Sequence, residues 1–211
     1  MAAQTSSEHW SQVWTDKNPA EVSWFEEMPR ASLALIKELN LPLEAPILDL
    51  GGGASGLAVE LRRRGYTDVT VADIAPAALE KARESKARES LGPAGEGIEW
   101  VVADVRSHDF GRRFALWHDR AVFHFMTDAA DRHAYLETLR RSVVPGGHLI
   151  IATFGPEGPT SCSGLPVVRY SGEELADTLG PGTQLVSCHL EDHHTPSGNT
   201  QQFLYAHLET R

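Results

Sequence analysis

Residues 49–56 of the chain read DLGGGASG, and three of their glycines, Gly51, Gly53 and Gly56, have the spacing G-x-G-x-x-G. A short apolar stretch comes just before them, and a helical pattern of apolar residues comes just after. A strand that ends in such a loop and opens a helix is typical of a site where backbone lies close to a bound nucleotide or nucleoside. Glycine allows the positive φ angles and the close approach that this requires. Taken alone, the three glycines would also be explained by a tight turn.

Strands and helices alternate on both sides of this loop. Seven strands are predicted, at 46–50, 69–73, 98–104, 114–119, 148–154, 184–192 and 201–209. Helices are predicted at 29–39, 56–64, 76–90, 128–143 and 171–179, and a Gly/Pro-rich loop at 155–170. This order predicts an α/β fold with a doubly wound, Rossmann-like and mostly parallel sheet. Too few residues join the last two strands for a helical crossover, so the last strand is expected to be antiparallel.

The bulk properties of the chain exclude several classes of protein. Its 211 residues suit one domain, 1–211, with a sizeable core. A net charge of −10 argues against nucleic acid as a partner, because phosphates are held by Lys and Arg. Two cysteines do not make a disulfide framework. No secretory signal pattern is present and no apolar run approaches the roughly 18 residues of a membrane span. We therefore expect a cytoplasmic protein with no membrane partner.

Three aspartates lie at the ends of predicted strands. Asp73 ends the second strand, where a carboxylate usually accepts hydrogen bonds from both ribose hydroxyls. Asp104 ends the third strand and can accept a hydrogen bond from an adenine amine. Asp49 would repel a pyrophosphate but suits the cationic methionine end of S-adenosylmethionine (SAM). No tyrosine is followed four residues later by lysine, which argues against a short-chain dehydrogenase. Each aspartate alone could simply cap a helix or loop.

The segments ILDLGGGASG, VTVADI, VVADV, WHDRAVFHF and VPGGHLIIATF resemble the class I SAM-dependent methyltransferases over roughly residues 45–155. The resemblance implies the fold of that family, SAM as cofactor, and methyl transfer to an N, O or S nucleophile of a small molecule. Many members have a larger residue in place of Gly52. We expect the glycine at this position to loosen the loop slightly. The cofactor residues that the resemblance implies are Asp49, Gly51 and Gly53 at the methionine part, Asp73 at the ribose, Ile74, Asp104 and Val105 at the adenine, and Asp119 in the fourth segment.

The acceptor site is predicted at the same edge of the sheet, after strands four, five and six, because the carboxyl ends of parallel strands meet there. His124 is the candidate general base, since a neutral imidazole accepts a proton near pH 7. It could instead be a half-buried loop histidine. The candidate substrate contacts are Trp14, Trp24, Phe123, Cys162, Arg169, His193 and His194. Of these, Cys162 could be a small buried residue, and the two histidines could be ordinary turn residues.

The segment 1–40 is predicted to be an N-terminal helical lid over the site. Trp10, Trp14, Trp24 and Phe25 are many large aromatic residues for a solvent-facing tail. We expect the segment to exclude water and to stack on substrate or cofactor. A fixed cover of the sheet edge is the alternative.

Other functions stay open at this stage. A protein-lysine methyltransferase would suit the acidic surface, although no substrate groove or accessory domain is visible. Cys162, His124 and one of His193 and His194 could hold a metal ion, or a thiol, selenium or metalloid substrate, although they match no standard zinc motif and we assign no metal. A SAM-binding module without catalysis ranks last, since nothing in the cofactor motifs is degraded. Monomer and homodimer are both open.

Overall fold

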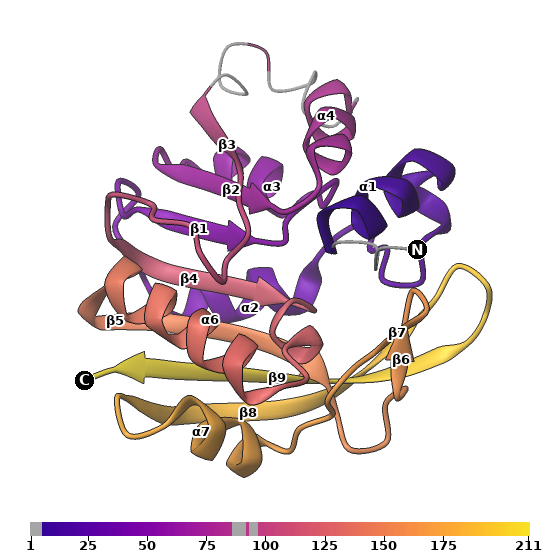
Figure 1. Cartoon of the computed structure of the whole chain (residues 1–211). Helices are drawn as coiled ribbons and strands as arrows, with labels where there is room; N and C mark the ends of the chain where they lie inside the picture. Colours follow the sequence, from indigo (N-terminus) through magenta and orange to yellow (C-terminus); the bar gives the residue numbers. More distant parts are fainter. Residues whose placement is uncertain (1–5, 86–91, 93–96) are drawn as a thin grey trace.

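The computed structural model describes residues 6–85, 92 and 97–211. Its main feature is a seven-stranded sheet with the strand order β3-β2-β1-β4-β5-β9-β8 (Figure 1). The strands are β1 (Ile47–Leu50), β2 (Val69–Asp73), β3 (Ile98–Val102), β4 (Phe114–Arg120), β5 (Val143–Phe154), β8 (Thr183–His194) and β9 (Thr200–Thr210). Strands β1 to β5 pair in parallel, and β9 is antiparallel to both β5 and β8. This confirms the predicted α/β fold with one antiparallel last strand.

Helices cover both faces of the sheet. Strand β1 illustrates this, because successive residues of a strand point to opposite faces of the sheet. Ile47 belongs to the apolar cluster that includes residues of α2 (Arg30–Glu38), α3 (Leu57–Arg63) and α4 (Pro76–Glu84). Leu48 belongs to the cluster that includes residues of α6 (Ala129–Ser142) and α7 (Gly172–Leu179). The sheet is thus doubly wound, and ligands bind such sheets at the carboxyl ends of the strands.

Two connections differ from the predicted ones. Helix α6 continues directly into β5, so the residues between the predicted helix 128–143 and the predicted strand 148–154 already belong to the strand. The hydroxyl of Thr210 explains this, since it accepts a hydrogen bond from Gly147 N (3.0 Å) and donates one to Val144 O (2.8 Å). The predicted loop at 155–170 contains a short hairpin of β6 (Ser161–Cys162) and β7 (Leu165–Pro166). The end of the predicted helix 76–90 lies outside the described residues, and α4 is seen as far as Glu84.

The N-terminal segment lies over the carboxyl edge of the sheet (Figure 1). Helix α1 (Ser6–Asp16) contacts α4, and buried Trp14 packs in one cluster with Ala75 and Ala78. Ser7 Oγ donates a hydrogen bond to Ile74 O (3.1 Å). A short 3-10 helix, η1 (Pro19–Glu21), follows α1. Helix α2 is different, because it contributes several residues to the core of the sheet. A lid can therefore extend only over the part of 1–40 that precedes α2.

Among the described residues, no helix combines the length and the apolar composition needed to cross a membrane.

Candidate active site

The glycine loop requires glycine at two positions, where the backbone is left-handed and a neighbouring side chain lies close. Gly51 has φ +66°, and its N–H donates a hydrogen bond to Ala72 O (2.7 Å). A Cβ on Gly51 would lie 2.1 Å from Val122 Cγ2. Gly53 has φ +44°, and a Cβ there would lie 3.0 Å from Asp73 Oδ2. The loop thus brings backbone directly against the strand ends at which the cofactor carboxylates were predicted.

Gly52 does not loosen the loop, contrary to our expectation. Its φ is not in the left-handed region, but a Cβ would lie 2.6 Å from Asp49 Oδ2 and 2.8 Å from Val71 Cγ1. Atoms of Asp49 and Val71 therefore already fill the space that a side chain at position 52 would need. Glycine allows close packing here.

Replacing Gly51 tests this loop. Gly51→Ala should lower the free energy of unfolding by about 1–2 kcal/mol from the left-handed backbone alone, with a further cost from the contact with Val122. The second change Val122→Ala should recover only the contact part. Urea unfolding of both variants measures the two terms. Gly182→Ala is the control, because no atom lies within 4 Å of a Cβ there and its φ is unstrained. Equal stability of Gly51→Ala and the unchanged protein would contradict the assignment.

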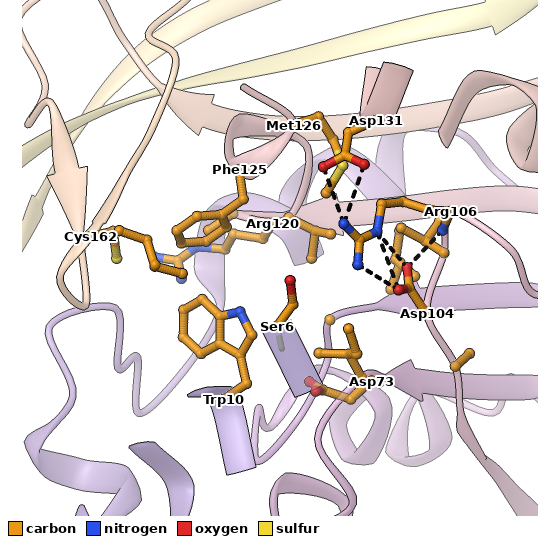
Figure 2. Close-up of a pocket in the computed structure, with 18 of the residues that line it drawn as sticks. Ser6, Trp10, Asp73, Asp104, Arg106, Arg120, Phe125, Met126, Asp131 and Cys162 are labelled. Carbon is orange, nitrogen blue, oxygen red and sulfur yellow. Dashed lines mark hydrogen bonds and ion pairs between the residues drawn. The ribbon is translucent and has the colours of Figure 1, made fainter. Parts of the chain in front are cut away.

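A cavity of about 270 Å³ runs along the carboxyl ends of the strands under α1 (Figure 2). A smaller cavity of about 60 Å³ lies beneath the glycine loop. Five residues line both cavities, so the two are adjacent: Trp14, Trp24, Leu50, Gly51 and Arg120. The larger cavity is walled by Asp73, Ile74, Asp104 and Val105 at one end and by Trp10, Phe125, Cys162 and Leu165 at the other. One continuous region thus has a polar end and an apolar end.

Asp73 lines the larger cavity and is only 8% exposed. Its Oδ1 accepts a hydrogen bond from Ala75 N (2.8 Å). Burial, with a smaller contribution from the charge of Asp49, raises the pKa of Asp73 to about 7, against opposing hydrogen bonds from backbone amides. A buried carboxylate of this kind gains from hydroxyl donors such as those of a ribose, because they favour its ionised form.

Asp104 lines the same cavity next to Val105 and is held by a side chain that sequence reasoning missed. Arg106 donates to both Asp104 oxygens (2.9 and 2.6 Å) and to Asp131 (3.1 Å). The hydrogen bonds from Arg106 lower the pKa of Asp104. The sequence feature that could have indicated this pairing is the position of Arg106, two residues after the strand-end Asp104. The ionised carboxylate keeps lone pairs with which it could accept from an adenine amine.

Asp49 lines the smaller cavity and begins a buried chain of polar groups. His118 Nδ1 lies 2.8 Å from Asp49 Oδ1, and His118 Nε2 lies 2.9 Å from Ser32 Oγ. Asp49 Oδ2 is buried and has no hydrogen-bond partner among the described residues. A buried carboxylate oxygen without a partner fits a cationic ligand group such as the ammonium of methionine. His118 and Ser32 were not predicted, because their pairing depends on the packing of α2.

Asp119 does not line either cavity, which corrects its predicted cofactor role. It is fully buried and accepts hydrogen bonds from Val122 N (2.9 Å), Phe123 N (3.1 Å) and Tyr135 Oη (2.6 Å). Burial raises its pKa to about 6. Asp119 therefore shapes the loop after β4, and Val122 of that loop faces the cavity.

His124 and Phe123 are turned into the core, which corrects their predicted roles. Both are fully buried on the one-turn helix η3 (Phe123–Phe125), and neither lines a cavity. His124 Nδ1 accepts a long hydrogen bond from Phe154 N (3.4 Å), and burial, followed by the charge of Arg120, lowers the His124 pKa to about 3. A general base must reach the proton that it removes. Phe125, the third residue of this turn, faces the cavity instead.

The other predicted substrate residues divide into two groups. Trp14, Trp24 and Cys162 line the larger cavity. His193, His194 and Arg169 line neither cavity. His193 Nε2 lies 2.8 Å from Ser23 O, and exposed His194 lies 3.2 Å from Thr200 Oγ1. Exposed Arg169 donates a long bond (3.3 Å) to Gly158 O, so these three serve local structure.

The alternative metal site does not form. In the described part of the chain, Cys162, His124, His193 and His194 do not make a cluster of three metal ligands. Cys162 is a free, buried thiol whose pKa is raised by burial. The geometry of the described residues therefore does not support the alternative of a metal ion held by these four side chains.

Arg120 was not predicted, and it lies in the wall of both cavities. Its Nε donates to Tyr205 Oη (2.9 Å) and lies 3.2 Å from Glu26, and its Nη1 donates to Trp24 O (2.9 Å). Its Nη2 is buried and has no hydrogen-bond partner among the described residues. An unpaired buried donor is costly, so this atom fits a ligand oxygen or anion.

Helix α1 and the segment before α2 should open and close over the cavity. Trp10 and Trp14 line the cavity, and the Ser7 hydroxyl links α1 to Ile74 O after β2. We expect amide hydrogen exchange in 7–27 to slow at least about tenfold when SAM or its demethylated product is added, because a bound ligand favours the closed state. Amides of α2 are the control. Equal protection of 7–27 with and without ligand would show a fixed cover.

Comparisons with known proteins agree with this geometry. A family model described as a methyltransferase domain matches residues 47–147. The chain is similar to EEF1A lysine methyltransferase 2 of Danio rerio, with 27% identity over 183 residues that cover 83% of this chain and 70% of the relative.

Two solved structures share the fold. The first is a SAM-dependent methyltransferase of Anabaena variabilis, with a TM-score of 0.77, 17% identity, and coverage of 99% of this chain and 96% of that one. The second is the N-methyltransferase NodS of Bradyrhizobium japonicum in complex with S-adenosyl-L-homocysteine, with a TM-score of 0.67, 17% identity, and coverage of 95% and 97%.

Proposed function

The chain belongs to the class I SAM-dependent methyltransferases, and we propose that it transfers the methyl group of SAM to a nitrogen, oxygen or sulfur atom of a small molecule. The observation that carries this proposal is the cavity beside the glycine loop. Its polar end has the strand-end carboxylates, and its far end is apolar and enclosed by Trp10, Phe125 and Leu165. The two cavities, of about 270 and 60 Å³, must hold the cofactor as well as the acceptor. This limited volume favours a small acceptor.

The cofactor residues can each be given a role. We propose that Asp73 accepts hydrogen bonds from the ribose hydroxyls and that Ile74 and Val105 contact the adenine. Asp104 then accepts a hydrogen bond from the adenine amine. Asp49 faces the cationic methionine end, and Gly51 and Gly53 let backbone approach it. Bound SAM supplies an electrophilic methyl group on a sulfonium.

The apolar end of the larger cavity, where we place the acceptor, has no side chain suited to act as a general base. Among the described residues that line the larger cavity there is no histidine, lysine, tyrosine or glutamate. The lining carboxylates belong to the cofactor end, and the Cys162 thiol has a raised pKa. The acceptor should therefore enter with a free lone pair, as an amine does, or as an anion such as a thiolate. Enclosure by Trp10 and Trp24 excludes water and orients the acceptor, and orientation is a large part of the catalysis of such displacements.

Arg120 supports an acceptor that carries an oxygen or a negative charge. Glu26, 3.2 Å away, already offsets much of its charge, but its buried Nη2 still lacks a partner. We infer that this N–H, which has no acceptor among the described residues, donates to an oxygen or thiolate of the substrate and so positions it.

A lysine of a protein is the second candidate acceptor. The 27% identity to EEF1A lysine methyltransferase 2 favours it, and the net charge of −10 would suit a basic partner. A lysine side chain would have to enter the same apolar end of the cavity.

Production of S-adenosyl-L-homocysteine from SAM separates these candidates. The protein is tested with a panel of small amines, thiols and phenols, with and without a neighbouring carboxylate, and with lysine-containing proteins. Turnover of a small acceptor that Trp10→Ala lowers, with SAM affinity kept, supports the proposal. Turnover confined to protein lysines would replace it by the second candidate. SAM binding without any turnover across both sets would favour a binding module.

A further inference from the structure

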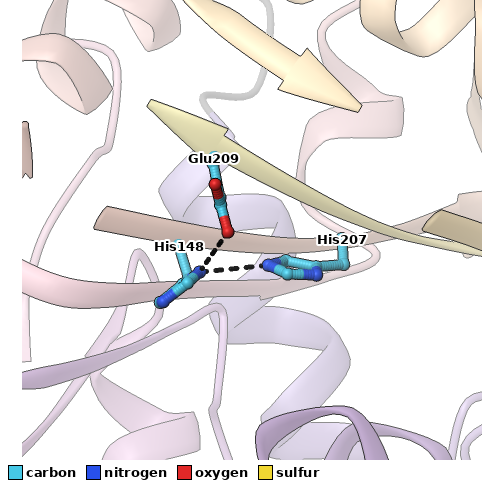
Figure 3. A group of neighbouring side chains, drawn as sticks. All are labelled: His148, His207 and Glu209. Carbon is cyan, nitrogen blue, oxygen red and sulfur yellow. Dashed lines mark hydrogen bonds and ion pairs between the residues drawn. The ribbon is translucent and has the colours of Figure 1, made fainter. Parts of the chain in front are cut away.

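Three metal-ligating side chains meet at the edge of the sheet that is opposite the cavity. His148 lies on β5, and His207 and Glu209 lie on β9 (Figure 3). In the antiparallel register His148 is opposite Glu209, and His207 is opposite Ile150. Residues two apart point to the same face, so all three side chains share one face of the sheet. His148 is six residues before Phe154, which places the group about 20 Å along the strand from its carboxyl end.

The distances between the ligand atoms suit a transition-metal ion. His148 Nδ1 lies 3.1 Å from His207 Nε2 and 3.6 Å from Glu209 Oε1. One ligand atom from each residue lies within 4.8 Å of the others. Zinc bonds to nitrogen and carboxylate oxygen at about 2.0–2.2 Å, so ligand atoms in a tetrahedral site are about 3.4 Å apart. The observed distances lie on either side of that value, and small side-chain rotations would equalise them.

We propose that His148, His207 and Glu209 bind a divalent transition-metal ion, with zinc as the best match, in a site separate from the methyl-transfer cavity. Two imidazoles and one carboxylate are a set that zinc accepts, and a water molecule or a fourth group would complete the coordination. The ion would connect β5 to β9 and so stabilise the fold. It would take no part in methyl transfer.

The surroundings favour a cation. A neutral imidazole is the form that binds metal. The carboxylates of Glu209 and of Glu38, at the end of α2, supply negative charge around the ion. The alternative is a hydrogen bond between the two rings with no metal.

Calorimetric titration of zinc chloride into chelator-treated, tag-free protein tests the proposal. We expect one equivalent of zinc to bind, and zinc at about 100 times Kd to raise Tm by about 5 °C or more. His207→Ala should weaken zinc binding at least about 100-fold, because even the loss of an outer partner of a metal ligand costs 10- to 100-fold. Glu209→Gln, at a half-exposed position, gives a second test if His207→Ala does not fold.

Two controls address adventitious zinc. His133→Ala removes an exposed histidine on α6, and Cys188→Ser removes an exposed thiol. Both should keep one equivalent of zinc with unchanged Kd and unchanged stabilisation. SAM affinity should be the same with and without zinc, because the cavity lies at the opposite edge. Zinc binding that is equal in all variants, or absent from the unchanged protein up to about 100 µM, would overturn the proposal and leave the two rings as a hydrogen-bonded pair.

Discussion

SAM should bind more tightly as pH rises from about 5.5 to about 7, by up to about tenfold per pH unit, and change little above pH 7. The cause is the buried carboxyl of Asp73, whose pKa in the ligand-free protein is raised to about 7. Ribose hydroxyls donate hydrogen bonds to the ionised form and therefore favour it. Binding below pH 7 then releases the proton that Asp73 holds. Calorimetry at several pH values in buffers of different ionisation enthalpy measures both the affinity and the released proton.

The same carboxyl should affect the stability of the ligand-free protein in the opposite direction. A raised pKa means that the fold favours the protonated form. The stabilising contribution of protonated Asp73 is therefore present below the unfolded pKa of 3.8 and is lost as pH rises toward 7. The pKa of buried Asp119 is also raised, so Asp119 changes the free energy of unfolding with pH in the same direction. The difference in this free energy between the unchanged protein and an Asp73 variant therefore isolates the contribution of Asp73.

Two variants complete the test of Asp73. Asp73→Ala should weaken SAM binding by about 10- to 150-fold at pH 7.5, the range for a lost hydrogen bond to a charged group. Asp73→Asn should bind weakly with an affinity that no longer rises between about pH 5.5 and about pH 7. Asp177→Asn, at an exposed position of α7, should keep both the affinity and its pH dependence. A folded Asp73→Ala protein with unchanged SAM affinity would show that another group holds the ribose.

The strand-end carboxylates that line the two cavities could be predicted because their positions depend on local patterns. Asp49 and Asp73 lie at strand ends, and the parallel sheet brings strand ends to one edge. His124 was misplaced because it belongs to a single 3-10 turn. Which residue of such a turn faces the cavity is decided by packing against Phe154 and Tyr135, far away in the sequence. Periodicity carries no information over three residues.

Contacts between distant segments account for the rest. The histidine pair His148 and His207 depends on the register of β9 against β5. The sequence predicts both strands, but neither their pairing nor which of their residues lie opposite each other. Arg120 looks like an ordinary charged residue after a strand-end aspartate. Its burial depends on Glu26, which comes from a segment with no strong pattern of its own.

Arg120→Met should lower the free energy of unfolding by about 3–5 kcal/mol, the usual cost of removing one partner of a buried ion pair. Arg120 and Glu26 have side-chain exposures of 11% and 15%, so Glu26 would be left as a buried charge without a cation. The variant also loses the donor to Trp24 O and the cation over the Phe203 ring, at 4.7 Å from its centroid. These contacts join the N-terminal segment to β4 and β9.

The Glu26→Gln change in the Arg120→Met background separates charge from packing. Burial raises the pKa of Glu26 and Arg120 lowers it, so without Arg120 the carboxyl should take up a proton more readily. The single variant should therefore recover stability as pH falls toward 5, whereas the double variant should not change with pH in this way. At pH 7.5 the double variant should be more stable than the single one, because no buried charge remains.

Urea unfolding at pH 5 and 7.5, followed by tryptophan fluorescence and circular dichroism, measures these differences. Arg169→Met is the matched control, because Arg169 is exposed and, within the described part of the chain, makes one long hydrogen bond, to Gly158 O. It should change the free energy of unfolding by no more than about 0.5 kcal/mol. A loss below about 1 kcal/mol in Arg120→Met, with an unchanged m value, would mean that water reaches the pair and that other contacts hold the segment before α2.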